Sequence, residues 1–185
     1  MIRLWSVLAI ACLCFSVQIQ GQEDTLSFWD RTNYEVLYSR TITGDRSGYS
    51  MSISGWYFVT PVIGLGPHMA YYDFNGLLNE TYLAPGLSAI YIKPLSQRLT
   101  SFGSVHLSYG IPRFPPEIMT EQNEGGILFY PHIGLIWKTK RQIGFSFSGG
   151  YVRQQMKAGI FEGFEGLTFY RIVYERYQIS LGLVF

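Results

Sequence analysis

The sequence has little cysteine, little charge of either sign, and no apolar run long enough for a membrane helix. Its two cysteines, Cys12 and Cys14, both lie near the N-terminus, so the rest of the 185-residue chain has none. Small secreted domains often depend on disulfides, so an exported chain without them needs another source of stability. Charged residues make up 15% of the sequence and the formal net charge is +1. Such a balance gives no bulk attraction to nucleic acid, and no basic cluster interleaved with aromatics offers a local one.

The N-terminal residues have the pattern of a signal peptide. Arg3 supplies a positive charge, Leu4–Phe15 is a short apolar stretch, and the polar run Ser16–Gln22 follows. A membrane-spanning helix needs about 20 apolar residues, and this stretch is shorter. A lipoprotein signal at Cys12 is the alternative reading of the same residues. The expected division is a signal peptide at 1–21, a periplasmic N-terminal segment at 22–32 and one barrel domain at 33–185.

Composition favours strands and turns over helices. Aromatic residues make up 17% of the chain, which includes 14 tyrosines and 20 glycines. Aromatic side chains are enriched in strands, and glycine is common in turns and at close approaches of the backbone. The length fits a single domain.

The last residues of the chain, Tyr177–Phe185, alternate strictly between two kinds of side chain. One face carries large apolar residues and the other small or polar ones, which is the period of a β-strand. In a soluble sandwich the apolar face would be the core, whereas in a membrane barrel it faces lipid. The apolar face consists of Tyr177, Ile179, Leu181, Leu183 and Phe185, and the other of Arg176, Gln178, Ser180 and Gly182.

Seven upstream segments show the same alternation, three of them less cleanly, so the sequence predicts eight antiparallel strands. Each is about ten residues long, which is the length that a tilted strand needs to cross a bilayer. Short connections alternate with longer ones, such as Ile111–Gly125 and Lys157–Leu167, as in barrels with short periplasmic turns and longer extracellular loops. The predicted strands are Asn33–Ile42, Tyr49–Tyr57, Val62–Tyr72, Tyr82–Ile92, Leu99–Tyr109, Ile127–Trp137, Gln142–Tyr151 and Tyr177–Phe185.

Aromatic residues of the outward face fall at the two ends of these strands. Amphipathic rings prefer the membrane interfaces, so the pattern predicts two girdles. Aromatics scattered by strand propensity alone are the alternative explanation. The periplasmic girdle would consist of Tyr57, Tyr91, Trp137 and Phe185, and the outer one of Tyr71, Tyr109, Tyr151 and Tyr177.

With its signal peptide, alternating strands and closing strand, the chain resembles the small outer-membrane β-barrels of OmpA/OmpX type, particularly the stand-alone barrels of Bacteroidetes-like bacteria. The resemblance covers Asn33–Phe185 and implies an all-β, eight-stranded, up-and-down transmembrane barrel in the outer membrane of a Gram-negative cell. It also implies that Phe185 acts as a signal for the barrel-assembly machinery.

Two groups of inward-facing residues invite a chemical interpretation. His68, His106 and His132 share the inward parity, and imidazoles are common metal ligands. A polar network within the barrel explains them equally well, and we expect no metal, cofactor or catalytic residue. The stretch His106-Leu107-Ser108 invites comparison with lipid A deacylases, which use a histidine and a serine two residues apart. Both residues have inward parity here and no orienting acid is identifiable, so a nucleophile is not expected.

The sequence therefore predicts a non-enzymatic outer-membrane barrel that contributes to envelope structure or binds through its loops. An eight-stranded barrel is filled by its own side chains, so no open pore is expected. The inward parity of Trp56, Phe102, Tyr130 and His132 predicts that they narrow the interior further. A lipid A deacylase and a soluble, exported lipocalin-like barrel are the alternatives. Expected partners are outer-membrane lipid and lipopolysaccharide, the assembly machinery during insertion, and a protein that meets the extracellular loops.

Overall fold

The computed structural model describes residues 31–42, 47–74, 81–113, 120–139, 143–161 and 167–185, with the side chains of 120–123, 158–161 and 167–170 excepted. The predicted signal peptide, residues 1–21, lies outside the described residues, as does the predicted segment 22–32 apart from its last two residues. The described chain from Thr32 onward forms one compact unit. Among the described residues, no helix is long and apolar enough to cross a membrane.

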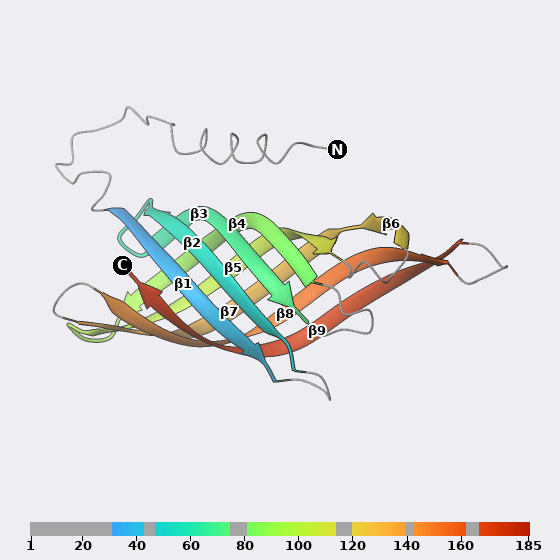
Figure 1. The fold of residues 1–185 in the computed structure, drawn as a ribbon. Coiled ribbons are helices and arrows are strands. Elements are labelled where there is room, and N and C mark those ends of the chain that lie inside the picture. The colour runs from blue at the N-terminus through green and yellow to red at the C-terminus, as the bar shows by residue number, and fades with distance from the viewer. Residues whose placement is uncertain (1–30, 43–46, 75–80, 114–119, 140–142, 162–166) are drawn as a thin grey trace, which may run out of the picture. The chain divides into compact units, whose positions relative to one another are not determined.

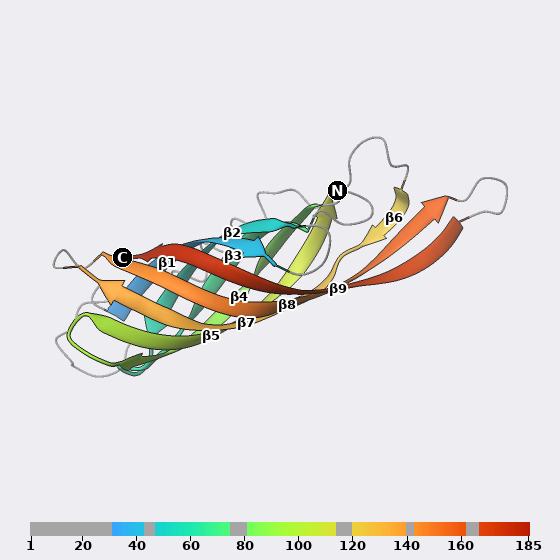
Figure 2. The same ribbon diagram turned by 90° about the horizontal axis from the view of Figure 1, so that it is seen from below.

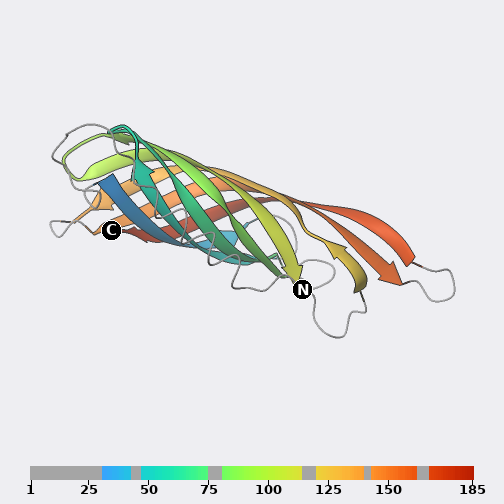
Figure 3. The same ribbon diagram turned by 90° about the horizontal axis from the view of Figure 1, so that it is seen from above.

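The described unit is a closed antiparallel β-barrel (Figures 1 and 3). Neighbouring strands are joined in chain order, except that β7 rather than β6 follows β5 around the wall. The barrel closes where β9 pairs with both β8 and β1. The strands are β1 (Thr32–Thr41), β2 (Tyr49–Phe58), β3 (Ile63–Asp73), β4 (Thr81–Pro94), β5 (Leu99–Arg113), β6 (Thr120–Glu124), β7 (Gly126–Lys138), β8 (Gly144–Phe161) and β9 (Leu167–Val184).

The prediction of an eight-stranded barrel is confirmed, with β6 as an addition to one strand of the wall. β7 pairs with β8 as far as Leu128 opposite Gln154, and β6 then pairs with β8 from Glu124 opposite Lys157. Because the same edge of β8 serves both, β6 continues the line of β7 beyond Gly125. The wall therefore holds eight strand positions, one of them interrupted.

The extents of two predicted loops are wrong, and with them the ends of the neighbouring predicted strands. The last strand begins at Leu167, ten residues before the predicted Tyr177, and the first five residues of the predicted loop Lys157–Leu167 belong to β8. The predicted loop Ile111–Gly125 likewise contains the end of β5 and all of β6. Charged residues gave the segment 157–167 the composition of a loop. β8 and β9 nevertheless pair with each other along their whole length, because each backbone polar group needs a partner.

The extension of β8 and β9 projects beyond the other strands at one end of the barrel (Figures 1 and 2). β8 and β9 have 18 residues each, whereas β1 and β2 have 10 each. We call this end the loop end. The opposite end, where residues 59–62 and 95–98 connect the strands and where β7 ends and β8 begins, is called the turn end.

Side chains alternate between the barrel interior and its outer surface along the strands wherever the structure describes them. Small inward residues let the facing side chains fill the interior. A Cβ atom on Gly150, for example, would come within 2.6 Å of the Tyr130 ring. Packing at this density leaves no room even for one extra methyl group, so the inward glycine is dictated by its neighbours.

Candidate functional site: a layered interior and an apolar outer wall

The outer wall is apolar around the barrel. Large apolar side chains are exposed on all eight strand positions, with Ile133 at 73% and Leu87 at 70% among the most exposed. A soluble protein rarely exposes a continuous apolar surface of this extent. The belt has the chemistry of a lipid-facing surface, and it includes Ile53, Leu65, Leu107, Phe147 and Leu181.

The eight predicted girdle residues all lie on the outer surface. Tyr91, Tyr109, Trp137, Tyr177 and Phe185 are more than half exposed, whereas Tyr57, Tyr71 and Tyr151 are half-buried. The half-buried Tyr71 and Tyr151 pack against neighbouring tyrosines, and the Tyr151 and Tyr177 ring centroids lie 5.5 Å apart. Because β8 and β9 are longer than predicted, this last pair lies within the strands and not at their ends. Their function at a membrane interface stays a prediction.

Phe185 lies at the turn end, beside the first strand. Its ring stacks on Tyr34 with centroids 6.5 Å apart, and the two residues exchange backbone hydrogen bonds of 2.8 and 3.0 Å. The terminal residue thus takes part in closing the barrel. Its function as an assembly signal stays a prediction.

An apolar layer fills the interior at the turn end. Trp56 and Phe102, predicted to narrow the interior, are both buried there. Indole and phenyl rings of this size occupy most of the cross-section of an eight-stranded barrel. The layer consists of Trp56, Ile90, Phe102, Ile136 and Val184, with Phe58 and Ile92 packed against it.

A second apolar layer, rich in aromatic rings, fills the interior at the loop end. Phe74 is its centre: its ring lies 5.2 Å from Tyr72, 5.4 Å from Tyr82 and 5.4 Å from Tyr174. The Tyr82 hydroxyl also contacts the Met156 sulfur. The remaining members are Ala70, Ala84, Leu128, Tyr130 and Val152.

Between the two layers the interior is polar, and the three histidines that were predicted to face inward meet there. His68 and His106 are joined by a 2.8 Å contact between their Nδ1 atoms, and Ser54 Oγ lies 2.9 Å from His68 Nδ1. The His132 ring stacks on His106 at 4.8 Å and on Tyr130 at 4.6 Å. The prediction that these side chains point inward is confirmed, and the structure brings the three of them together.

A second polar chain crosses the same layer. Tyr130 Oη lies 2.9 Å from Ser180 Oγ, which donates to Ser39 Oγ at 2.7 Å. Several neighbouring polar atoms, including Gln178 Oε1 and His132 Nε2, are buried without a protein partner. Buried polar atoms of this kind are satisfied by water in folded proteins. The middle layer is thus polar, and its unpaired atoms are suited to bound water.

The described residues include no group of three or more His, Cys, Asp or Glu side chains placed to hold a metal ion. The His106 and His132 rings stack, and the His68 ring meets His106 at 51°, whereas metal ligands must aim their nitrogen lone pairs at one point. Their contacts with serine and tyrosine match the polar-network interpretation of the three histidines.

The structure does not bring His106 and Ser108 together as a catalytic pair. His106 contacts Ser104 and His68, whereas Ser108 Oγ is buried without a hydrogen-bond partner. A serine nucleophile needs a base within hydrogen-bond reach and access to its substrate. Both side chains point into the closed interior, away from the lipid that a deacylase would attack.

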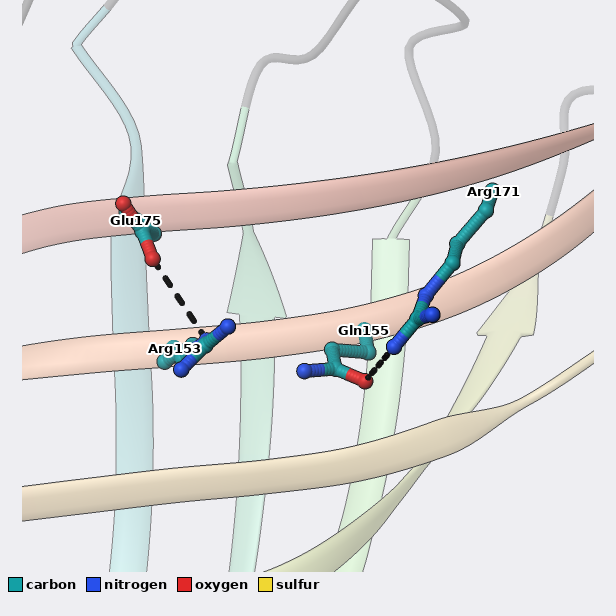
Figure 4. A network of polar contacts seen from close by, with 4 residues as sticks. All are labelled: Arg153, Gln155, Arg171 and Glu175. Atoms are coloured by element: carbon teal, nitrogen blue, oxygen red, sulfur yellow. Dashed lines mark hydrogen bonds and ion pairs between the residues drawn. The ribbon is translucent and has the colours of Figure 1, made fainter.

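Sequence reasoning missed a charged surface on the extended β8–β9 pair. Arg153 and Glu175 form an ion pair of 3.4 Å, and Arg171 donates to Gln155 Oε1 at 2.8 Å (Figure 4). Alternation of buried Val152, Gln154 and Met156 with these outward residues was the available signal. It was overlooked because the outward residues are charged rather than apolar.

The fold and the apolar wall define a class: this is a small transmembrane β-barrel of the outer-membrane type. The crystal structure of Neisserial surface protein A is similar to it, with a TM-score of 0.56 and 15% identity over 83% of this chain and 94% of that one. Outer membrane protein AlkL, solved by solid-state NMR in DMPC bilayers, is similar with a TM-score of 0.54 and 10% identity over 89% and 94%. No family model matches the chain, and no curated protein matches it. At these identities the likeness concerns the fold, and for the fold the predicted OmpA/OmpX-type resemblance is confirmed.

Proposed function

We propose that the protein is a non-enzymatic barrel of the outer membrane that supports the envelope and binds at its loop end. The observation that carries the proposal is the layered interior. Apolar side chains fill both ends and enclose the polar middle, so a solute has no continuous polar path. Outer-membrane lipid and lipopolysaccharide would surround the apolar belt, and the assembly machinery would meet the chain during insertion.

Binding at the loop end is supported by the projection of β8 and β9 together with β6. Side chains there, such as Val173 and Lys157, are exposed on a rigid, hydrogen-bonded scaffold. Binding surfaces on such scaffolds keep their shape before the partner arrives, which lowers the entropic cost of association. A protein at the cell surface is the kind of partner that this scaffold suits.

The closed interior is tested by solute flux into vesicles. The purified protein, refolded in phosphatidylcholine vesicles, is expected to give no swelling in small sugars, whereas a known porin gives swelling in the same assay. Heat-modifiable gel migration of the same sample shows that the barrel has formed. Swelling by the folded protein would contradict the proposal.

Binding at the loop end is tested by a photo-crosslinking residue in intact cells. Placed at Val173, it is expected to give a discrete adduct, whereas the matched position Leu95 at the turn end is expected to give none of the same mass. Equal adducts at both positions would contradict surface binding. For the enzymatic alternative, mass spectrometry of lipid A from cells with and without the protein is expected to show the same acylation.

A further inference from the structure

An open groove of about 600 Å³ crosses the apolar belt on the outer surface of β5, β7, β8 and β9. It exists because two outward positions, Gly103 and Gly149, have no side chain. They lie on either side of Ile133 in the sheet register. A Cβ atom on Gly149 would meet no other atom closer than 3.9 Å, and one on Gly103 none closer than 3.8 Å. Ile133 thus stands between two outward positions that have no side chain.

Pro131 adds to the groove by interrupting the wall. It lies among the lining residues, and the pairing of β7 with β8 skips it, from Phe129 opposite Arg153 to His132 opposite Gly150. Proline has no amide hydrogen to donate to β8. The groove therefore follows the weakest hydrogen-bonded part of this wall.

Directly toward the loop end, the outward face of β8 and β9 changes from apolar through aromatic to charged. Tyr151 and Tyr177 lie opposite each other beside the groove, and the next outward pair is Arg153 with Glu175. The outward pair after that is Gln155 with Val173, and Lys157 with Arg171 follows it, four residues beyond Arg153 on β8 (Figure 4 shows the Arg171 side of this surface). A lipid of the outer leaflet has the same order along the membrane normal: its acyl chain lies in the hydrocarbon, and its headgroup lies beyond the interface.

The charges at the far end of this surface favour an anion. Lys157 and Arg171 are direct cross-strand partners on the outward face, and like charges in this position repel. Lys157 also pairs with Glu124 at 3.1 Å, while Arg171 donates to the neutral Gln155. A phosphate would relieve the repulsion and accept charge-assisted hydrogen bonds from both cations.

The dimensions fit a lipid of the outer leaflet. Lys157 is eight residues beyond Gly149 on β8. With Tyr151 and Tyr177 at the membrane interface, Lys157 lies six residues beyond it, which is about 14 Å along the membrane normal at about 3.3 Å per residue and a tilt of about 45°. The groove therefore lies on the hydrocarbon side of that interface, and the two cations lie on the headgroup side.

We propose that this surface binds one phosphorylated lipid of the outer leaflet, with an acyl chain in the groove and a phosphate at Lys157 and Arg171. The inference rests on the proposed function, because it requires the barrel to be in a membrane. It goes further by naming one lipid chemistry and one site on the wall.

The test is lipid retention by the folded full-length protein in detergent, measured by native mass spectrometry after incubation with diphosphoryl lipid A. One retained lipid per barrel is expected. The same lipid without phosphates should be retained at least about tenfold less, because it cannot form charge-assisted hydrogen bonds with Lys157 and Arg171. Inorganic phosphate alone should not bind, because it cannot use the groove.

Two variants address the two halves of the site, each with a matched control. K157Q/R171Q removes the cations, and K93Q/K138Q makes the same charge change at exposed turn-end positions. G149L fills the groove, and A89L adds a similar side chain at an exposed position of β4 outside it. Retention of diphosphoryl lipid A should fall about tenfold in K157Q/R171Q and in G149L. It should remain unchanged in the controls K93Q/K138Q and A89L. Heat-modifiable migration of every variant shows that the barrel has folded.

Three outcomes would overturn the inference. Equal retention of phosphorylated and unphosphorylated lipid would show no phosphate site, and equal loss in test and control variants would show no local site. A lipid-free dimer that G149L converts to a monomer would show that the groove binds a second copy of this chain. Each of these leaves the folded, sealed barrel intact, so the failure of the inference is distinguishable from failure of the proposed function.

Discussion

Replacing one outward isoleucine by arginine tests whether the apolar belt faces lipid. Ile53 is 52% exposed and lies five residues before the turn end of β2 at Phe58. With about 3.3 Å per residue and a tilt of about 45°, it lies about 12 Å from that end, near the middle of a belt about 25 Å tall. An arginine at the bilayer midplane costs about 2–4 kcal/mol, so Ile53→Arg should lower the free energy of unfolding by that amount.

The matched control is Ile63→Arg. Ile63 is also an exposed isoleucine, at 41%, but it is the first residue of β3 and lies at the turn end. Near the interface the same change costs about 0–1 kcal/mol. Reversible guanidinium unfolding in phosphatidylcholine vesicles, followed by tryptophan fluorescence, measures both values.

A soluble barrel would behave in the opposite way. On a wall exposed to water, Ile53→Arg would leave stability nearly unchanged and raise solubility in the absence of detergent. Equal effects of the two substitutions, or a detergent-free soluble protein in either variant, would refute a lipid-facing belt.

Three further predictions concern the interior, the projection and the closing strand. Trp56→Ala should destabilise the barrel by about 3–5 kcal/mol, because it empties the turn-end layer, yet vesicles should still not swell because the loop-end layer remains; swelling would show that one layer alone seals the interior. Glu175→Gln should cost less than about 1 kcal/mol in guanidinium unfolding, because its ion pair with Arg153 is exposed, and a larger loss would mean that the projection depends on this pair. Phe185→Ala should lower the amount of barrel in cell envelopes while the purified variant still refolds in vesicles; normal envelope levels would argue against an assembly signal.

Much of the fold could be predicted because strand periodicity is a local property. In Tyr177–Phe185 the alternation of apolar with small or polar side chains determines which face of the strand meets the barrel interior. The same parity placed Trp56, Phe102 and Tyr130 inside, and the structure confirms all three. The number of strands could be predicted because an alternating segment of about ten residues crosses the membrane once and therefore counts as one strand.

The extension of β8 and β9 could not be predicted in the same way. Its outward residues, including Arg153, Lys157 and Glu175, are those of a solvated surface, so local hydrophobicity gives no strand signal beyond the belt. What makes these residues strands is the pairing of β8 with β9 along their whole length, which is a contact between two segments. Pairing across a hairpin depends on the partner as much as on the segment itself.

The sequence by itself determined strand number, the face of each side chain and the apolar belt, because these depend on the order of residues within one strand. Only the tertiary structure decided what the inward side chains form together: two apolar layers around a polar layer that contains His68, His106 and His132. It also aligned Gly103, Ile133 and Gly149 into a groove and set Lys157 opposite Arg171. Heights in a barrel are set by the stagger between strands, and stagger exists only once the sheet has closed.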